Sequence, residues 1–99
     1  QRLIDLIDTS SSDSVLFISG DRHRGGLYQL TSSSGKNIVE MTSSSLNLSF
    51  TNDEEAGPLR IGPTFVQENY GEILLNKLTN KLTVNLKDNQ GSIVQSVDL

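Results

Sequence analysis

Residues 15–23 read VLFISGDRH, a short apolar run that stops at a glycine and is followed by an aspartate and the chain's single histidine. A β-branched and aromatic run between turn formers is typical of a buried strand, and α/β proteins place their chemistry in the loops that leave such strands. Asp21 and His23 lie two positions apart, so an extended exit segment would project both side chains to the same side. One carboxylate and one imidazole suit iron, manganese or zinc better than a pure calcium site. An isolated Asp-x-His segment is nevertheless more often an ordinary solvated turn.

Composition sets the limits on fold and function. The chain has 99 residues, of which 34% are hydrophobic, so it forms at most one small domain with a modest core. It has no cysteine, which excludes a disulfide framework and a thiolate metal site. The formal net charge of −4 provides no basic face, so we expect no nucleic-acid binding surface. No apolar run reaches the roughly 20 residues of a membrane-spanning helix, so we expect no transmembrane segment.

The first residues predict the end of a helix. Apolar side chains recur with helical spacing within residues 2–8, and the chain opens in the middle of that pattern. We therefore expect residues 1–99 to be the C-terminal fragment of a longer domain, although a natural short amphipathic helix would give the same pattern. The polar loop at 8–14 leads directly into the apolar strand, and a helix followed by such a strand is half of a parallel crossover unit.

Later segments predict hairpins and further strands. Residues 25–30 and 37–42 alternate on either side of a hairpin-type loop, so we expect them to pair antiparallel. The prolines, glycines and acidic residues at 51–63 favour an irregular surface loop. Three more strand-like segments follow, at residues 70–76, 81–87 and 92–99. The chain is thus predicted to be β-rich.

Several separated segments together resemble one family, the alkaline phosphatase D (PhoD-like) branch of the calcineurin-like metallophosphoesterases. The resemblance is to the C-terminal part of that family and extends over nearly the whole chain in matching order. The segments that carry it are FISGDRH at 17–23, VEMTSSSL at 39–46, ENYGEI at 68–73 and the closing hairpin at 82–99.

The resemblance implies an α/β fold in which this chain is the β-rich, C-terminal part of an αββα sandwich. Residues 1–99 would supply a short N-terminal helix and mainly antiparallel strands and hairpins to a single catalytic domain. Asp21 and His23 would be metal ligands and catalytic residues for two or more ions, with iron, calcium, manganese and zinc as candidates. The implied reaction is hydrolysis of a phosphate ester by a metal-activated water. The family's earlier ligands have no counterpart here, so the fragment alone would be inactive, with the upstream remainder of the domain as its partner. Relatives commonly act outside the cytoplasm, which implies a periplasmic or secreted location.

Other polar groups near the motif have weaker claims to a role. Arg22 and Arg24 flank the histidine and are candidates for binding a phosphate through a bidentate guanidinium. Strand alternation would point them away from Asp21 and His23, which favours salt bridges at the sheet rim instead. The glycines at 25–26 lack the Gly-Lys-Ser/Thr ending of a P-loop, so close backbone approach or a bulge explains them better.

Two other interpretations remain. A noncatalytic β-rich binding or assembly module would explain the strands and treat the Asp-Arg-His segment as an ordinary loop. A degraded or truncated homologue would keep the sheet and lose catalysis, although the intact Asp21 and His23 argue against decay. A serine nucleophile at 43–45 is disfavoured, since no Gly-x-Ser-x-Gly elbow accompanies it. Faces and edges left open in a fragment also predict poor solubility or self-association of the isolated chain.

Overall fold

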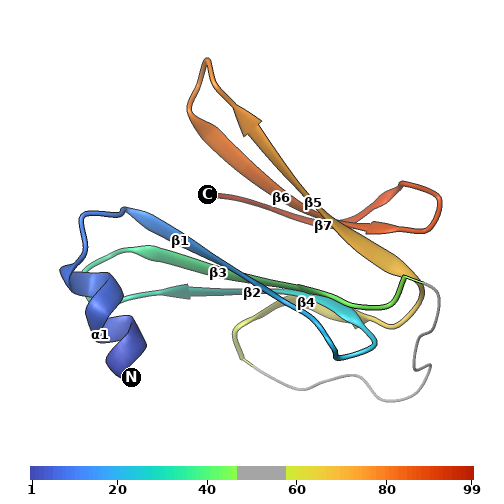
Figure 1. Cartoon of the computed structure of the whole chain (residues 1–99), viewed down its shortest axis with the longest axis horizontal. Coiled ribbons are helices and arrows are strands. Elements are labelled where there is room, and N and C mark those ends of the chain that lie inside the picture. Colours follow the sequence, from blue (N-terminus) through green and yellow to red (C-terminus); the bar gives the residue numbers. More distant parts are fainter. Residues whose placement is uncertain (47–57) are drawn as a thin grey trace.

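The computed structural model describes residues 1–46 and 58–99 of the chain. These residues form one short helix and two β-sheets that face each other, with the helix on the far side of the larger sheet (Figure 1). All but one of the strand pairs are antiparallel. The structure therefore confirms a small β-rich unit with one short N-terminal helix and mainly antiparallel strands.

The larger sheet, sheet A, has the strand order β1-β3-β2-β4. Its strands are β1 at Ser14–Ser19, β2 at Gly25–Thr31, β3 at Asn37–Ser43 and β4 at Arg60–Phe65. β1 and β3 run parallel, with Ser19 opposite Thr42, whereas β2 pairs antiparallel with both of its neighbours. The strand after residue 14 and the antiparallel pairing of residues 25–30 with 37–42 are both confirmed.

Strand β4 corrects part of the loop expected at 51–63. Residues 51–57 lie outside the described part of the chain, but Arg60–Phe65 is a strand at one edge of sheet A. Pro63 has no N–H to donate and Gly62 has a φ of 68°, features that favour a loop when they are read from composition alone. An edge strand tolerates both, because one of its sides donates nothing to the described sheet.

The smaller sheet, sheet B, is an antiparallel meander in the order β5-β6-β7. Its strands are β5 at Asn69–Asn76, β6 at Lys81–Asp88 and β7 at Ile93–Asp98. These bounds confirm the three later strands and the closing hairpin. The β5–β6 hairpin projects away from the rest of the molecule (Figure 1).

The hydrophobic core lies between the two sheets. Its buried side chains come from β2, β3 and β6 and are Leu27, Met41, Val84 and Leu86. Two glycines let the sheets approach closely. A Cβ on Gly25 would lie 2.8 Å from Leu86 Cδ1, and a Cβ on Gly71 would lie 2.5 Å from Met41 Sδ. The pairing of β2 with β4 also shifts register between Gly25 and Leu27. The close approach or bulge expected at residues 25–26 is confirmed.

The opposite face of sheet A is partly covered by α1, at Arg2–Thr9, which confirms the expected helix. Ile7 is the buried residue of this helix. Lys36 Nζ donates to the Ile7 carbonyl oxygen at 2.8 Å, which places a cation at the negative end of the helix dipole. The Ser34 hydroxyl donates to the Asp8 carboxylate at 2.6 Å. The loop between β2 and β3 therefore fastens the end of α1 to the sheet.

Candidate functional site

Asp21 and His23 lie in the loop that joins β1 to β2, residues 20–24, hereafter the 20–24 loop. β3 lies between β1 and β2, so this loop must cross the end of β3 and span two strand spacings, about 10 Å. Because β1 and β3 are parallel, the loop and the segment that follows β3 emerge at the same edge of sheet A. The expected position of the motif at a strand end is thus found in the structure.

The conformation of the 20–24 loop differs from the extended exit segment expected from the sequence. Asp21 has a φ of 63° and His23 a φ of 53°, both in the left-handed region, and residues 22–24 form a bend. Strand alternation therefore does not set the direction of these side chains, and the same-side argument for them is wrong. The physical reason is the crossing of β3, which requires a tight turn rather than continued extension. Strand alternation therefore also gives no reason for Arg22 and Arg24 to point away from Asp21 and His23.

The Ser44 hydroxyl hydrogen-bonds to the backbone of the 20–24 loop. Ser44 comes directly after β3, and its Oγ accepts a hydrogen bond from the Arg22 N–H at 2.8 Å. The same hydroxyl donates to the Arg24 carbonyl oxygen at 3.4 Å. The sequence alone does not predict this role: it places Ser44 in the family-like segment at 39–46 and disfavours a nucleophile at 43–45. The role could have been found only from the parallel pairing of β1 with β3, because β1 leads directly into the 20–24 loop and β3 leads directly into Ser44.

The serines on either side of Ser44 connect the two sheets to each other. Ser43 Oγ donates to Asn69 Oδ1 at 2.9 Å, and the Asn69 N–H donates to the Ser45 carbonyl oxygen at 2.8 Å. Asn69 is buried and its amide also donates to the Gln67 carbonyl oxygen at 2.7 Å. These bonds connect the end of β3 to the start of β5. The segment after β3 therefore ties sheet A to sheet B through Asn69 and to the 20–24 loop through Ser44.

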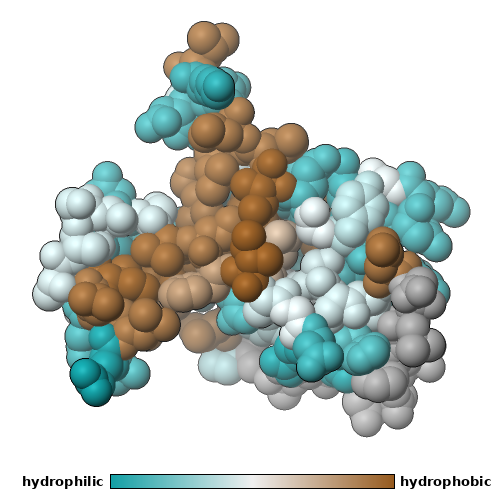
Figure 2. Space-filling model, in the orientation of Figure 1, coloured by the Kyte–Doolittle hydropathy of each residue, from teal (hydrophilic) through white to brown (hydrophobic). Residues whose placement is uncertain are grey.

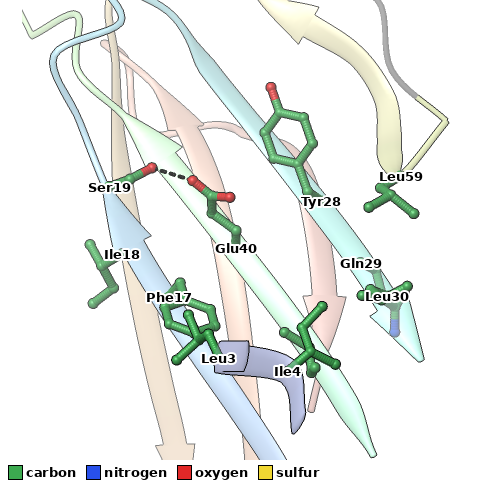
Figure 3. Close-up of a pocket in the computed structure, with 11 residues that line it drawn as sticks. Leu3, Ile4, Phe17, Ile18, Ser19, Tyr28, Gln29, Leu30, Glu40 and Leu59 are labelled. Atoms are coloured by element: carbon green, nitrogen blue, oxygen red, sulfur yellow. Dashed lines mark hydrogen bonds between the residues drawn. The ribbon is translucent and has the colours of Figure 1, made fainter. Parts of the chain in front are cut away.

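A second polar contact lies at the same end of β1. Ser19 Oγ donates to Glu40 Oε1 at 2.7 Å, and both residues line one end of a groove on the outer face of sheet A (Figure 3). The groove has a volume of about 400 Å³. The rest of its lining is largely apolar and comes from α1, the first three strands and the residue before β4, with Leu3, Ile4, Phe17, Tyr28, Leu30 and Leu59 as examples.

Glu72 and Lys87 form an ion pair on sheet B, and each shifts the pKa of the other. Lys87 Nζ lies 2.9 Å from Glu72 Oε2, between β6 and β5. Hydrogen bonds from Lys87 and from Asn85 lower the pKa of the Glu72 carboxyl, and the same carboxylate raises the pKa of Lys87. This pair supports the pairing of β5 with β6 and belongs to the framework rather than to the 20–24 loop.

The donor set for a metal is incomplete. Within residues 1–46 and 58–99, no group of three or more His, Cys, Asp or Glu side chains is gathered in a way that could hold a metal ion. The 20–24 loop offers one carboxylate and one imidazole, a pair whose chemistry fits a hard or borderline cation. The residue types therefore fit, but further ligands would have to come from residues other than these.

Comparisons with known proteins give no neighbour: a scan against protein-family models, a search of curated proteins and a search of solved structures each found no match. The likeness to alkaline phosphatase D therefore rests on the four sequence segments quoted above. In the described part of the chain, no helix is both long enough and apolar enough to cross a membrane.

Proposed function

We propose that this chain is the C-terminal part of a metal-dependent phosphoric ester hydrolase of the alkaline phosphatase D type, and that its 20–24 loop supplies the last metal ligands, Asp21 and His23. The observation that carries the proposal is the backbone of this loop. Two residues that bear metal-binding side chains both adopt left-handed conformations, in a tight loop at a strand end.

The crossing of β3 explains the left-handed conformations but not the presence of residues other than glycine at these two positions. This region disfavours residues other than glycine, although Asp and His enter it more often than most. Backbone strain of this kind persists only where surrounding structure enforces it, and it gathers at functional sites. Glycines at 21 and 23 would form the same turn with less strain, yet the sequence has Asp21 and His23 there. A requirement for their side chains explains this choice.

The roles of the loop residues follow from their chemistry. Metal ions held there would neutralise phosphoryl oxygens and activate a water for attack. Asp21 would contribute a hard oxygen and negative charge. His23 would bind through one ring nitrogen, with the other nitrogen donating to an acceptor that fixes the ring. Arg22 and Arg24 lie next to these ligands and are the candidates for binding the phosphate of the substrate.

The rest of the site would come from upstream residues of the same catalytic domain. β1 is the edge strand of the described sheet A, yet it is strongly apolar, and Ile18 on it is 66% exposed. Figure 2 shows apolar surface over α1 and β1 that continues up the β5–β6 hairpin. An apolar edge strand and an open apolar groove are features that natural proteins keep covered. A further strand beside β1 and additional helices would complete the αββα sandwich.

This part of the proposal predicts that the isolated chain self-associates or is poorly soluble, whereas the intact protein is not. Light scattering on both at equal concentration measures the difference. A monomeric isolated chain that unfolds cooperatively would contradict the expected upstream cover. A periplasmic or secreted location belongs to the same proposal and rests on the family resemblance.

Activity of the intact protein tests the function. A phosphomonoester and a phosphodiester substrate are each supplied with iron, calcium, manganese or zinc, and the wild type is compared with His23→Ala. We expect the variant to lose hydrolysis by about 100-fold or more, since a direct ligand matters more than its supporting contacts, whose loss weakens metal binding by about 10- to 100-fold. Asn89→Ala, an exposed change in the β6–β7 turn, is the control and should keep wild-type rates.

Equal hydrolysis by the wild type and His23→Ala would contradict the metal role. The open apolar groove then favours the second candidate, a noncatalytic β-rich binding or assembly module that uses this groove of about 400 Å³. Absence of hydrolysis by the wild type with every metal would also favour the module.

A further inference from the structure

The Ser44 hydroxyl makes two hydrogen bonds to the 20–24 loop, one on each side of His23. It accepts from the Arg22 N–H at 2.8 Å and donates toward the Arg24 carbonyl oxygen at 3.4 Å. Arg22 itself separates Asp21 from His23. A single side chain therefore contacts the backbone next to both candidate ligands while lying 22 residues away in the sequence from Arg22.

The topology explains why this contact forms. The 20–24 loop crosses the end of β3, where its backbone has left the ladder of β1 and has not yet joined that of β2. Backbone groups in such a position need partners from elsewhere. Ser44 is the first residue after β3 and stands at the crossing point. Its hydroxyl can donate and accept at once, which suits a loop that presents one N–H and one carbonyl.

The neighbouring serines separate this function from packing. Ser43 and Ser45 bond to Asn69 at the joint between the sheets, and Ser45 is almost fully buried. Ser44 is only half-buried, and its hydroxyl bonds to the backbone of the 20–24 loop. Removal of its hydroxyl therefore acts on the loop and leaves the core contacts of its neighbours in place.

We propose that Ser44 is a positioning residue that holds the 20–24 loop in the left-handed conformation that presents Asp21 and His23 to the metal ions. The inference rests on the proposed function of these two residues as ligands. Ser44 touches neither metal nor substrate. Supporting contacts of this kind alter metal affinity by about 10- to 100-fold when they are removed.

The test uses the intact protein and two kinds of readout. Hydrogen exchange of the Arg22 amide reports the loop, and titration of the metal-free protein with Mn²⁺ or Zn²⁺ reports the site. Ser44→Ala should speed Arg22 exchange by about tenfold, as expected for loss of one hydrogen bond, and weaken metal binding by about 10- to 100-fold. Ser44→Thr keeps the hydroxyl and should restore both quantities to within about threefold of the wild type.

The metal dependence of hydrolysis distinguishes positioning from a general folding defect. For Ser44→Ala, the metal concentration that gives half-maximal activity should rise, whereas kcat at saturating metal should stay near the wild-type value. A folding defect would lower the maximum at every metal concentration. Ser43→Ala is the matched control, because it removes an adjacent hydroxyl that bonds to Asn69, and it should leave Arg22 exchange and metal affinity unchanged.

Three results would overturn the inference. Wild-type metal affinity in Ser44→Ala would show that the ligands do not depend on this hydroxyl. Unchanged Arg22 exchange in that variant would show that the hydroxyl does not hold the loop. Absence of metal binding by the wild type would contradict the proposed function itself, and the Arg22 exchange measured beside it would show separately whether Ser44 holds the loop.

Discussion

The 20–24 loop and the β6–β7 turn at 88–92 both reverse the chain next to a strand, but they are held in different ways. In the turn, Asp88 Oδ1 accepts from the N–H groups of Gln90 and Ser92, each at 2.9 Å, and Gly91 takes the left-handed position with a φ of 83°. In the 20–24 loop, the left-handed positions belong to Asp21 and His23. The β6–β7 turn is held by its own residues and places a glycine in the left-handed position, whereas the 20–24 loop places Asp21 and His23 there and is supported by the distant Ser44.

Removing the charge of Asp21 should have a much larger effect than removing that of Asp88 in the β6–β7 turn. Asp21→Asn retains a residue that tolerates the left-handed region but removes the negative charge, so we expect metal affinity and hydrolysis in the intact protein to fall by about 100-fold or more. Asp88→Asn keeps an Oδ1 acceptor in the turn and should change neither. Metal titration and initial rates measure both. Retained activity in Asp21→Asn would show that the loop resembles the turn, with its residues chosen for conformation alone.

A medium effect is expected at the glycines that bound the loop. A Cβ on Gly25 would lie 2.8 Å from Leu86 Cδ1, so Gly25→Ala should lower the free energy of unfolding by about 1–3 kcal/mol through overpacking. A Cβ on Gly20 would lie 3.6 Å from Ser44 Cβ, an ordinary contact, so Gly20→Ala should change it by less than about 0.5 kcal/mol. Denaturant unfolding of the two variants gives the comparison. Equal losses of unfolding free energy in the two variants would show that the contact with Leu86 does not exclude a side chain at position 25.

A smaller effect is expected from the turn itself. Asp88→Ala removes the acceptor of two backbone N–H groups and should lower the free energy of unfolding by about 1 kcal/mol, as loss of a comparable cap does, without altering metal affinity. Ser44→Ala should show the reverse, a change in metal affinity that exceeds its change in stability. Urea unfolding combined with metal titration of both variants measures the contrast. A loss of metal affinity in Asp88→Ala would break the distinction between the two segments.

The smallest effect concerns pH and sheet B. The Glu72 pKa is lowered from its ordinary 4.5 by hydrogen bonds from Lys87 and Asn85. A lowered folded-state pKa means that the stabilisation is complete above the unfolded value and is lost as pH falls below 4.5 through the folded value. Lys87 has a raised pKa, so its part is complete below the ordinary 10.5 and is lost as pH rises above it.

Glu72→Gln should therefore flatten part of the acid limb of stability against pH. Melting temperatures of the wild type and the variant between pH 3 and 7 measure this difference, which we expect to be small because the pair is partly exposed. The opposite result, a steeper acid limb in Glu72→Gln, would contradict the lowered Glu72 pKa.

Much of the fold could be predicted because local patterns decide it. The alternation at 81–87 and the turn chemistry at 88–91 are both local, and β6 and β7 lie where these predict them. The strand β4 could not be predicted, because Pro63 and Gly62 are read as loop signals and only the pairing with β2 overrides them. Its place in the sheet depends on residues more than 30 positions earlier in the chain.

The candidate site was predictable in position and not in geometry. The apolar run at 15–18 and the glycine that follows it place Asp21 and His23 at a strand end, and this prediction needs only the local sequence. Their left-handed backbone follows from the crossing of β3, and the support from Ser44 follows from the parallel pairing of β1 with β3. Both depend on contacts between segments about 20 residues apart. Sequence periodicity contains no information about such contacts.

A crystal structure of the intact protein, with anomalous diffraction from its metal ions, would show whether the 20–24 loop supplies metal ligands. We expect an anomalous peak about 2.0–2.2 Å from a His23 ring nitrogen, with an Asp21 oxygen at a similar distance from a metal ion. Metal ions bound elsewhere in an active enzyme, with His23 and Asp21 out of their reach, would contradict it.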